Sequence, residues 1–147
     1  MKKRILGMVS LMVLAVLAST RVAQAQQSLL VNIPFDFVAG NQTLPAGQYA
    51  VSVASVGHSL LLVDRKDGIA SAFLITNAVA ANEIQTESKL IFNRYGDRYF
   101  LSKVWTEGNS RGRELLKSAR EKEMAQTAKN ETQGQVTLVA ELTRTTR

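Results

Sequence analysis

The chain has 147 residues, with 18 Lys and Arg against 12 Asp and Glu, so its formal net charge is +6. It contains no cysteine and only one histidine. These counts exclude disulfide bonds and the common cysteine- and histidine-rich zinc sites. The length is sufficient for one domain with its own hydrophobic core.

The first 25 residues have the three-part pattern of a secretory signal peptide. Met1–Arg4 is basic, residues 5–18 form an apolar run, and Ala23–Ala25 has the small-x-small pattern of a cleavage site. The apolar run is shorter than the roughly 18–20 residues that span a bilayer. We therefore expect export to the periplasm or the extracellular space, cleavage before Gln26, and a mature chain without a transmembrane span. A retained membrane anchor is the alternative.

Removal of residues 1–25 changes the distribution of charge. The remaining chain has 14 basic and 12 acidic side chains, a net charge of +2. Residues 26–88 then carry a net charge of −3, whereas residues 89–147 carry +5. A basic C-terminal half can bind an anionic partner, but a helix with a charged, solvent-exposed face would also be rich in basic residues. The charge alone therefore identifies no ligand.

Alternating apolar residues predict strands in the first half of the mature chain. Residues 31–37 alternate strictly, and Pro34 should place that strand at an edge or a bulge because proline donates no ladder hydrogen bond. Further strands are predicted over 49–54, 60–63 and 69–76, which completes a four-stranded meander. Asn77 to Glu87 has no clear period, so we expect a loop there.

The segment between the first two predicted strands is rich in turn-forming residues. Gly40 and Gly47 tolerate backbone conformations that other residues avoid, and Pro45 cannot lie in a central strand. Leu44 can then face the core while Tyr49 begins the next strand. The pattern predicts a structured inter-strand loop in preference to a loop that grips a ligand.

The second half predicts a hairpin, a helix and a final strand. Residues 89–94 and 98–106 are rich in strand formers, and Gly96 lies in the turn between them. Residues 111–128 favour a helix, capped at Ser110, under which Trp105 would pack. Residues 135–143 alternate again.

These elements predict one mainly β domain over residues 26–147. We expect a single antiparallel β-sandwich or partly open barrel of about seven strands, with one helix in the C-terminal half. The last strand should return to the sheet after the helix, and a place beside the first strand is one position open to it.

Few residues could carry catalysis or bind a metal. His58 lies in a predicted turn, and its neighbour Ser59 would point to the opposite face of a strand. Asp64 and Asp67 flank a tight turn and lack the spacing of a calcium loop. We therefore predict no catalytic, cofactor-binding or metal site and no enzyme activity. A hydrolase that uses His58 and carboxylates is the alternative.

Binding is better supported by the sequence than catalysis. The predicted hairpin combines cations with aromatic rings at Arg94, Tyr95, Arg98 and Tyr99, and such sets can hold sugars, nucleic acid or anionic lipid. A plain structured turn is the alternative for these residues. We therefore expect an exported, non-catalytic binding or structural module whose partner is an envelope or extracellular component or an anionic polymer.

Two longer motifs carry a resemblance to a protein group. They are FDFVAGNQTLPAGQY, over residues 35–49, and LIFNRYGDRYFLSKVW, over residues 90–105. The chain resembles small exported bacterial proteins of unknown function that have a signal peptide, an F-x-F-x-x-G-x-x-x-L-P-A-G-x-Y segment and a later aromatic hairpin. The likeness covers most of the mature chain. It implies a shared fold but carries no activity or site.

Overall fold

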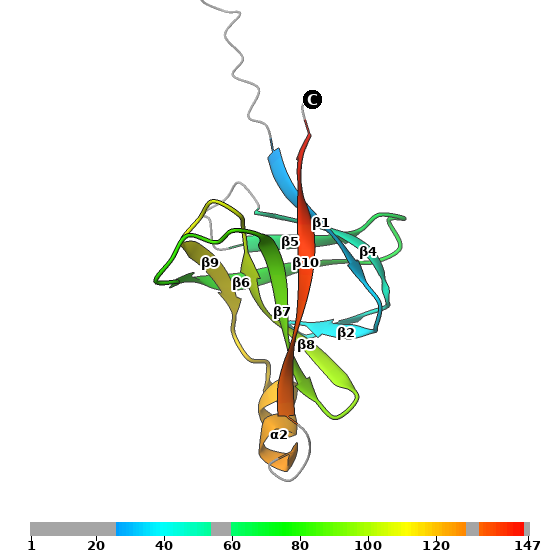
Figure 1. Ribbon diagram of the computed structural model, residues 1–147. Helices are drawn as coiled ribbons and strands as arrows, with labels where there is room; N and C mark the ends of the chain where they lie inside the picture. The colour runs from blue at the N-terminus through cyan, green and yellow to red at the C-terminus, as the bar shows by residue number, and fades with distance from the viewer. Residues whose placement is uncertain (1–25, 54–59, 129–132, 146–147) are drawn as a thin grey trace, which may run out of the picture.

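The computed structural model describes residues 26–53, 60–128 and 133–145. Within these ranges the chain forms ten strands and one helix (Figure 1), so the predicted mainly β class is confirmed. The elements are β1 (Gln26–Ile33), β2 (Phe37–Ala39), β3 (Gln42–Leu44), β4 (Gly47–Val53), β5 (Leu60–Arg65), β6 (Ser71–Ala80), β7 (Ser88–Tyr95), β8 (Arg98–Trp105), β9 (Arg111–Leu115), α2 (Ala119–Thr127) and β10 (Gln133–Thr145).

Eight of the strands close into an antiparallel barrel. They follow one another in the order β8-β7-β10-β1-β4-β5-β6-β9, and β9 pairs back onto β8. The two remaining strands extend the sheet from β8, since β2 pairs with it in parallel and β3 pairs with β2. The final strand lies between β7 and β1, which confirms that it returns to the sheet beside the first strand.

The predicted count of about seven strands was too low. Two of the additional strands, β2 and β3, have three residues each, which is too few to show a period. The third, β9, lies where the sequence predicted a helix. In addition, β6 runs on to Ala80, so the loop predicted over 77–87 begins later than expected.

The first strand ends before its proline. β1 pairs with β10 along one edge and with β4 along the other, so it is a central strand, and the predicted edge position or bulge at Pro34 was wrong. Pro34 lies just outside it, where no ladder donor is needed. The strand predicted over 31–37 is divided, since Phe37 begins β2. The alternation in burial holds in part: Val31, Ile33 and Phe37 are buried, and Phe35 is half-buried.

Apolar side chains fill the interior of the barrel. Three aromatic rings meet edge to face at its centre, with Phe37 centred 5.2 Å from Tyr49 and 5.5 Å from Phe92. Aliphatic side chains from eight of the strands surround them: Leu29, Val31, Ile33, Leu44, Val51, Val63, Leu74, Leu90, Leu101, Val104 and Leu115. Among the described residues, these side chains form one hydrophobic core.

The glycine- and proline-rich segment is an ordered connection, as predicted. Gly40 adopts a φ of 61° in the turn between β2 and β3, which favours glycine. Leu44 is buried, and the Tyr49 hydroxyl donates a 2.6 Å hydrogen bond to the Pro45 carbonyl four residues earlier. This arrangement resembles a tyrosine corner, in which a buried tyrosine fixes the backbone upstream of its own strand.

We expect replacement of Tyr49 by phenylalanine to lower the free energy of unfolding by about 1 kcal/mol, because the partly buried hydrogen bond to Pro45 is lost. Burial raises the pKa of the Tyr49 hydroxyl above its ordinary value of 10.0, although the Arg65 guanidinium opposes the shift. The folded state therefore favours the neutral phenol, so stability should decline as pH rises above 10. Denaturant unfolding at pH 8 and at pH 11 should show a smaller pH effect in Tyr49→Phe. An equal decline in both proteins would contradict this expectation.

Only the second half of the helix predicted over 111–128 is helical. Residues 111–115 form β9, and the helix begins only after Ser118, whose hydroxyl accepts a hydrogen bond from the Glu121 amide at 3.2 Å. Pairing of β9 with both β6 and β8 outweighs the intrinsic helix preference of these residues. Ser110 is therefore not the N-cap.

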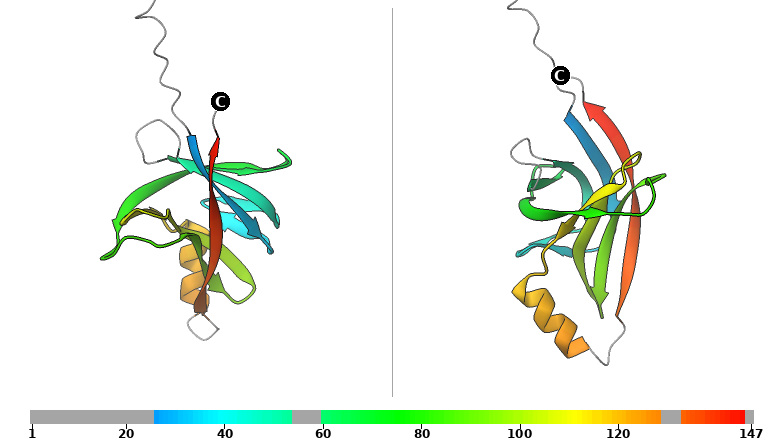
Figure 2. Two further views of the ribbon diagram at one scale, coloured as in Figure 1. Left: turned by 45° about the horizontal axis from the view of Figure 1, so that its top comes forward. Right: turned by 90° about the vertical axis from the view of Figure 1, so that its left-hand side faces the viewer.

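α2 packs against the β7–β8 hairpin, at the end of the barrel away from the C-terminus (Figures 1 and 2). Ala128, at its C-terminal end, joins a small buried cluster with Val38, Tyr95 and Phe100. Trp105 is not part of this cluster, so the prediction that it packs under the helix was wrong. It lies instead against Gly112 of β9.

Candidate functional site

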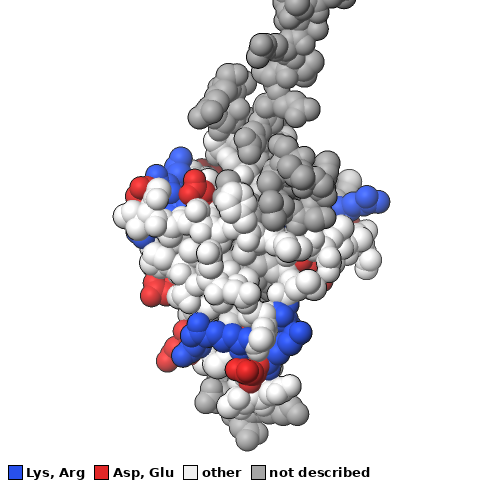
Figure 3. All heavy atoms as spheres, turned by 180° about the vertical axis from the view of Figure 1, so that it is seen from behind, with Lys and Arg blue, Asp and Glu red and all other residues white. Residues whose placement is uncertain are grey.

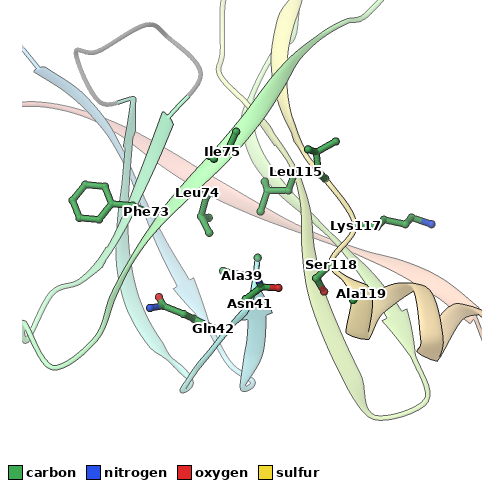
Figure 4. A pocket seen from close by; sticks show the side chains of 12 residues that line it. Ala39, Asn41, Gln42, Phe73, Leu74, Ile75, Leu115, Lys117, Ser118 and Ala119 are labelled. Carbon is green, nitrogen blue, oxygen red and sulfur yellow. The ribbon is translucent and has the colours of Figure 1, made fainter.

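A fork in the barrel wall forms a hollow. β6 pairs with β9 from Ala80–Arg111 to Thr76–Leu115, and β9 ends there because the chain turns away toward α2. The two segments diverge beyond this point, and a hollow of about 590 Å³ opens between them. The β2–β3 turn, over residues 39–42, forms its third wall (Figure 4). We call this hollow the β6–β9 fork.

The floor of the β6–β9 fork is apolar and closely packed. Ala39, Leu74 and Leu115 are buried there, and Figure 4 shows Leu74 directed toward Ala39 on the β2–β3 turn. A Cβ atom on Gly40 would lie 3.2 Å from the Leu74 side chain. Glycine therefore allows the turn to approach β6 closely.

The rim of the β6–β9 fork combines exposed apolar side chains with polar groups. Phe73 is 67%, Ile75 71% and Leu116 63% exposed. Asn41, Gln42 and Ser118 supply polar atoms, and Lys117 is the one charged residue among those that line the hollow. Large apolar side chains gathered at a concave surface indicate a binding site.

The predicted cationic and aromatic patch is divided by the hairpin. Arg94 pairs across the strands with Tyr99, and Tyr95 pairs with Arg98, so the two pairs occupy opposite faces of the sheet. Tyr95 is buried against Phe100 beneath α2. The four residues therefore do not share one surface.

The other face of the hairpin holds a stack of side chains. The Tyr99 ring lies 3.9 Å from the ring of Phe35, and the Arg94 guanidinium carbon lies 5.7 Å from the centre of Tyr99. Arg94 also donates a 2.8 Å hydrogen bond to the Gly96 carbonyl in the turn. Arg94 is thus engaged within the protein, whereas Arg98 is exposed.

We expect Arg98, and not Arg94, to carry any binding of anionic polymers at this hairpin. Arg98→Ala should weaken salt-sensitive binding to DNA, an acidic polysaccharide or anionic vesicles and leave the melting temperature nearly unchanged. Arg94→Ala should lower the stability by about 0.5–1 kcal/mol, because its contact with the Tyr99 ring is lost. Titrations at two salt concentrations and thermal melts measure both effects. Equal binding by the two variants would contradict the assignment.

Cations also gather near α2. Figure 3 shows Lys and Arg side chains in a band toward the end of the molecule where α2 lies, while the middle of the same face carries few charges. Lys103 is paired with Glu114 at 3.5 Å. On this face, a band of cations therefore lies next to a largely uncharged surface (Figure 3).

The described residues that were considered for catalysis form no catalytic arrangement. His58 lies outside the described residues. Asp67 accepts a hydrogen bond from the Ile69 amide and forms an ion pair with Arg65 at 3.1 Å, while Asp64 is exposed. In the part of the chain that the structure describes, no three His, Asp or Glu side chains gather in a way that could hold a metal ion.

Glu121 is a buried carboxylate that the sequence analysis did not select. Its Oε1 atom accepts a 2.8 Å hydrogen bond from the Asn93 side chain and a 3.5 Å contact from the Tyr95 hydroxyl. It thereby joins α2 to β7. The spacing Ser118-x-x-Glu121 is a capping-box pattern that could have indicated both the helix start and this residue.

Among the described residues, no helix is long and apolar enough to span a bilayer. Comparisons with protein-family models, curated proteins and solved structures found no match for this chain.

Proposed function

We propose that this chain is an exported, non-catalytic binding domain of the cell envelope or the extracellular space, and that its partner docks at the β6–β9 fork. Support for export comes from the pattern of residues 1–25. Support for a binding role comes from a barrel interior filled by apolar side chains, which leaves the outer surface to meet a partner.

The observation that carries the proposal is the exposure of apolar residues at the fork. Phe73 and Ile75 alternate with buried Ala72 and Leu74 along β6, so they point outward on a strand where polar residues are usual. Leu116 adds a third apolar side chain from the opposite side of the hollow. Keeping such a cluster in contact with water is unfavourable, and a partner that covers it removes that cost.

Site-specific crosslinking in an exporting bacterium tests the proposal. A photo-reactive amino acid at position 75 should give discrete adducts, whereas the same group at position 69 should not. Ile69 is the matched control, because it is also an exposed isoleucine, at 76% against 71% for Ile75, and it does not line the fork. The same adduct pattern at both positions, or none at either, would refute the proposal.

The processing of the chain is tested separately. Intact-mass analysis of protein recovered from the periplasm or the medium should give a chain that begins at or near Gln26. Recovery of residues 1–25 on the protein in a membrane fraction would overturn the predicted export and cleavage.

A further inference from the structure

One edge of β6 is unpaired where it borders the fork. Residues 71–75 pair with β5 along one edge, and pairing with β9 on the other edge begins only at Thr76. Within the described residues, the second edge of Ser71–Ile75 therefore has no strand partner. Alternate backbone N–H and C=O groups along this edge are directed toward the hollow.

This edge lacks the features that usually prevent strand addition. Exposed edges are commonly protected by charged side chains, proline or a bulge. Residues 71–75 read Ser-Ala-Phe-Leu-Ile, with no charge and no proline, and their pairing with β5 is regular. A five-residue edge of this kind can pair with an extended chain over about 17 Å.

We infer that the β6–β9 fork binds an extended peptide segment of a partner protein, which adds as a strand to the free edge of β6. The inference rests on the proposed function and specifies the chemistry of the partner. Backbone hydrogen bonds would hold the segment, and alternate side chains would contact Phe73 and Ile75 on one face and the floor at Leu74 on the other.

The shape of the fork favours a single segment over the same edge of a second copy. The edge is recessed, because the β2–β3 turn and the Leu115–Ala119 segment both line the hollow beside it. Two recessed edges cannot approach to the 4.7–4.9 Å spacing of paired strands unless these walls move. A lone extended chain meets no such obstacle.

The charge at the rim specifies one end of the segment. Lys117 is the only charged residue that lines the hollow, and it is exposed. Its side chain extends away from the floor on the α2 side in Figure 4. Lys117 follows Leu115 by two residues, and Leu115 pairs with Thr76, so Lys117 lies on the Ile75 side of the free edge. An acidic group is therefore complementary at that end. Since antiparallel pairing is the more stable, the acidic residue should come first in the segment.

Synthetic peptides of one composition test the inference. The probes are acetyl-Asp-Val-Thr-Val-Thr-Val-Ser-amide and its counterpart with Asp and Ser exchanged, added to the mature chain. We expect the first to bind more tightly, by about two- to fivefold at low salt, and the difference to shrink as salt rises. Backbone amide NMR shifts and slowed hydrogen exchange should be centred on residues 71–75.

N-methylation of the peptide distinguishes strand addition from plain apolar contact. N-methyl groups on the valines and N-methyl groups on the threonines block opposite edges of the added strand. One set should weaken binding about tenfold or more, because edge hydrogen bonds are lost, while the other set should change it less than about twofold.

Matched variants of the protein locate the contacts. Ile75→Ser should weaken binding about fivefold or more, while Ile69→Ser should not change it. Lys117→Gln should abolish the preference for the peptide that begins with Asp, and Lys122→Gln, which alters an exposed lysine on α2, should preserve it. Thermal melts establish that each variant is folded.

Several results would overturn the inference. These are equal effects of the two N-methyl sets, no peptide binding, shifts confined to β3, or a dimer of the chain alone that Ile75→Ser dissociates. None of them removes the proposed binding function, provided that crosslinks still form at position 75. The absence of those crosslinks would instead refute the proposed function itself.

Discussion

Replacement of Phe37 by alanine should lower the free energy of unfolding by about 3–5 kcal/mol, the usual cost of removing a large aromatic side chain from a closed core. Phe37 is only 1% exposed and packs edge to face against Tyr49 and Phe92. Phe37 belongs to a strand of only three residues. Its contribution to the free energy of unfolding therefore comes from burial of the ring and not from the hydrogen bonds of the sheet. Denaturant unfolding of the wild type and Phe37→Ala measures the difference.

Phe73 provides the matched control for Phe37. It is the same residue type, 67% exposed on the outer face of β6, and Phe73→Ala should change stability by no more than about 0.5 kcal/mol. A large loss for Phe73→Ala would mean that the outer face of β6 is covered in the isolated chain. A small loss for Phe37→Ala would contradict the core packing at the centre of the barrel.

The regular part of the fold could be predicted because it depends on local pattern. Alternation of apolar residues identified the strands that contain Val31, Tyr49 and Phe92, and Gly96 marked the turn of the hairpin. These signals follow directly from the two-residue period of a strand with one buried face. Such local signals predict a strand wherever one of its faces is buried against the core and the other is exposed.

The misassigned region depends on distant partners instead. Apart from Gly112, residues 111–115 have helix-forming side chains, yet they form β9 because β6 and β8 both supply edges for them. Neither edge is visible in the local sequence. Pro34 misled for a similar reason, since it lies just beyond a central strand and not within an edge strand.

The candidate site was missed because three separate segments build it. Ala39, Leu74 and Leu115 are far apart in the sequence, and each reads as an ordinary core residue. The one local signal was Phe73 with Ile75, since both lie on the outward positions of a strand whose inward positions, Ala72 and Leu74, are also apolar. By contrast, the predicted hairpin patch failed to form one surface because cross-strand pairing assigns its members to two faces.

Replacement of Gly112 by alanine should destabilise the barrel by about 1–3 kcal/mol, as expected for overpacking against a buried side chain. A Cβ atom at this position would lie 2.6, 2.8 and 2.9 Å from three carbons of the Trp105 ring, and Trp105 is only 7% exposed. Glycine in a strand interior otherwise costs about 0.5–1 kcal/mol relative to alanine. The steric overlap exceeds that gain, so the net effect should be a loss.

Gly134→Ala is the control for Gly112→Ala. Gly134 also lies within a strand, and a Cβ atom there would meet nothing within 4 Å, so alanine should be neutral or stabilise by about 0.4–1 kcal/mol. Trp105 is the only tryptophan, and its fluorescence should shift in Gly112→Ala alone.

Displacement of Trp105 would also disturb β9, whose end forms one wall of the β6–β9 fork, so Gly112→Ala should reduce peptide binding while Gly134→Ala retains it. Equal stability and equal fluorescence in the two variants would show that Trp105 does not pack on Gly112.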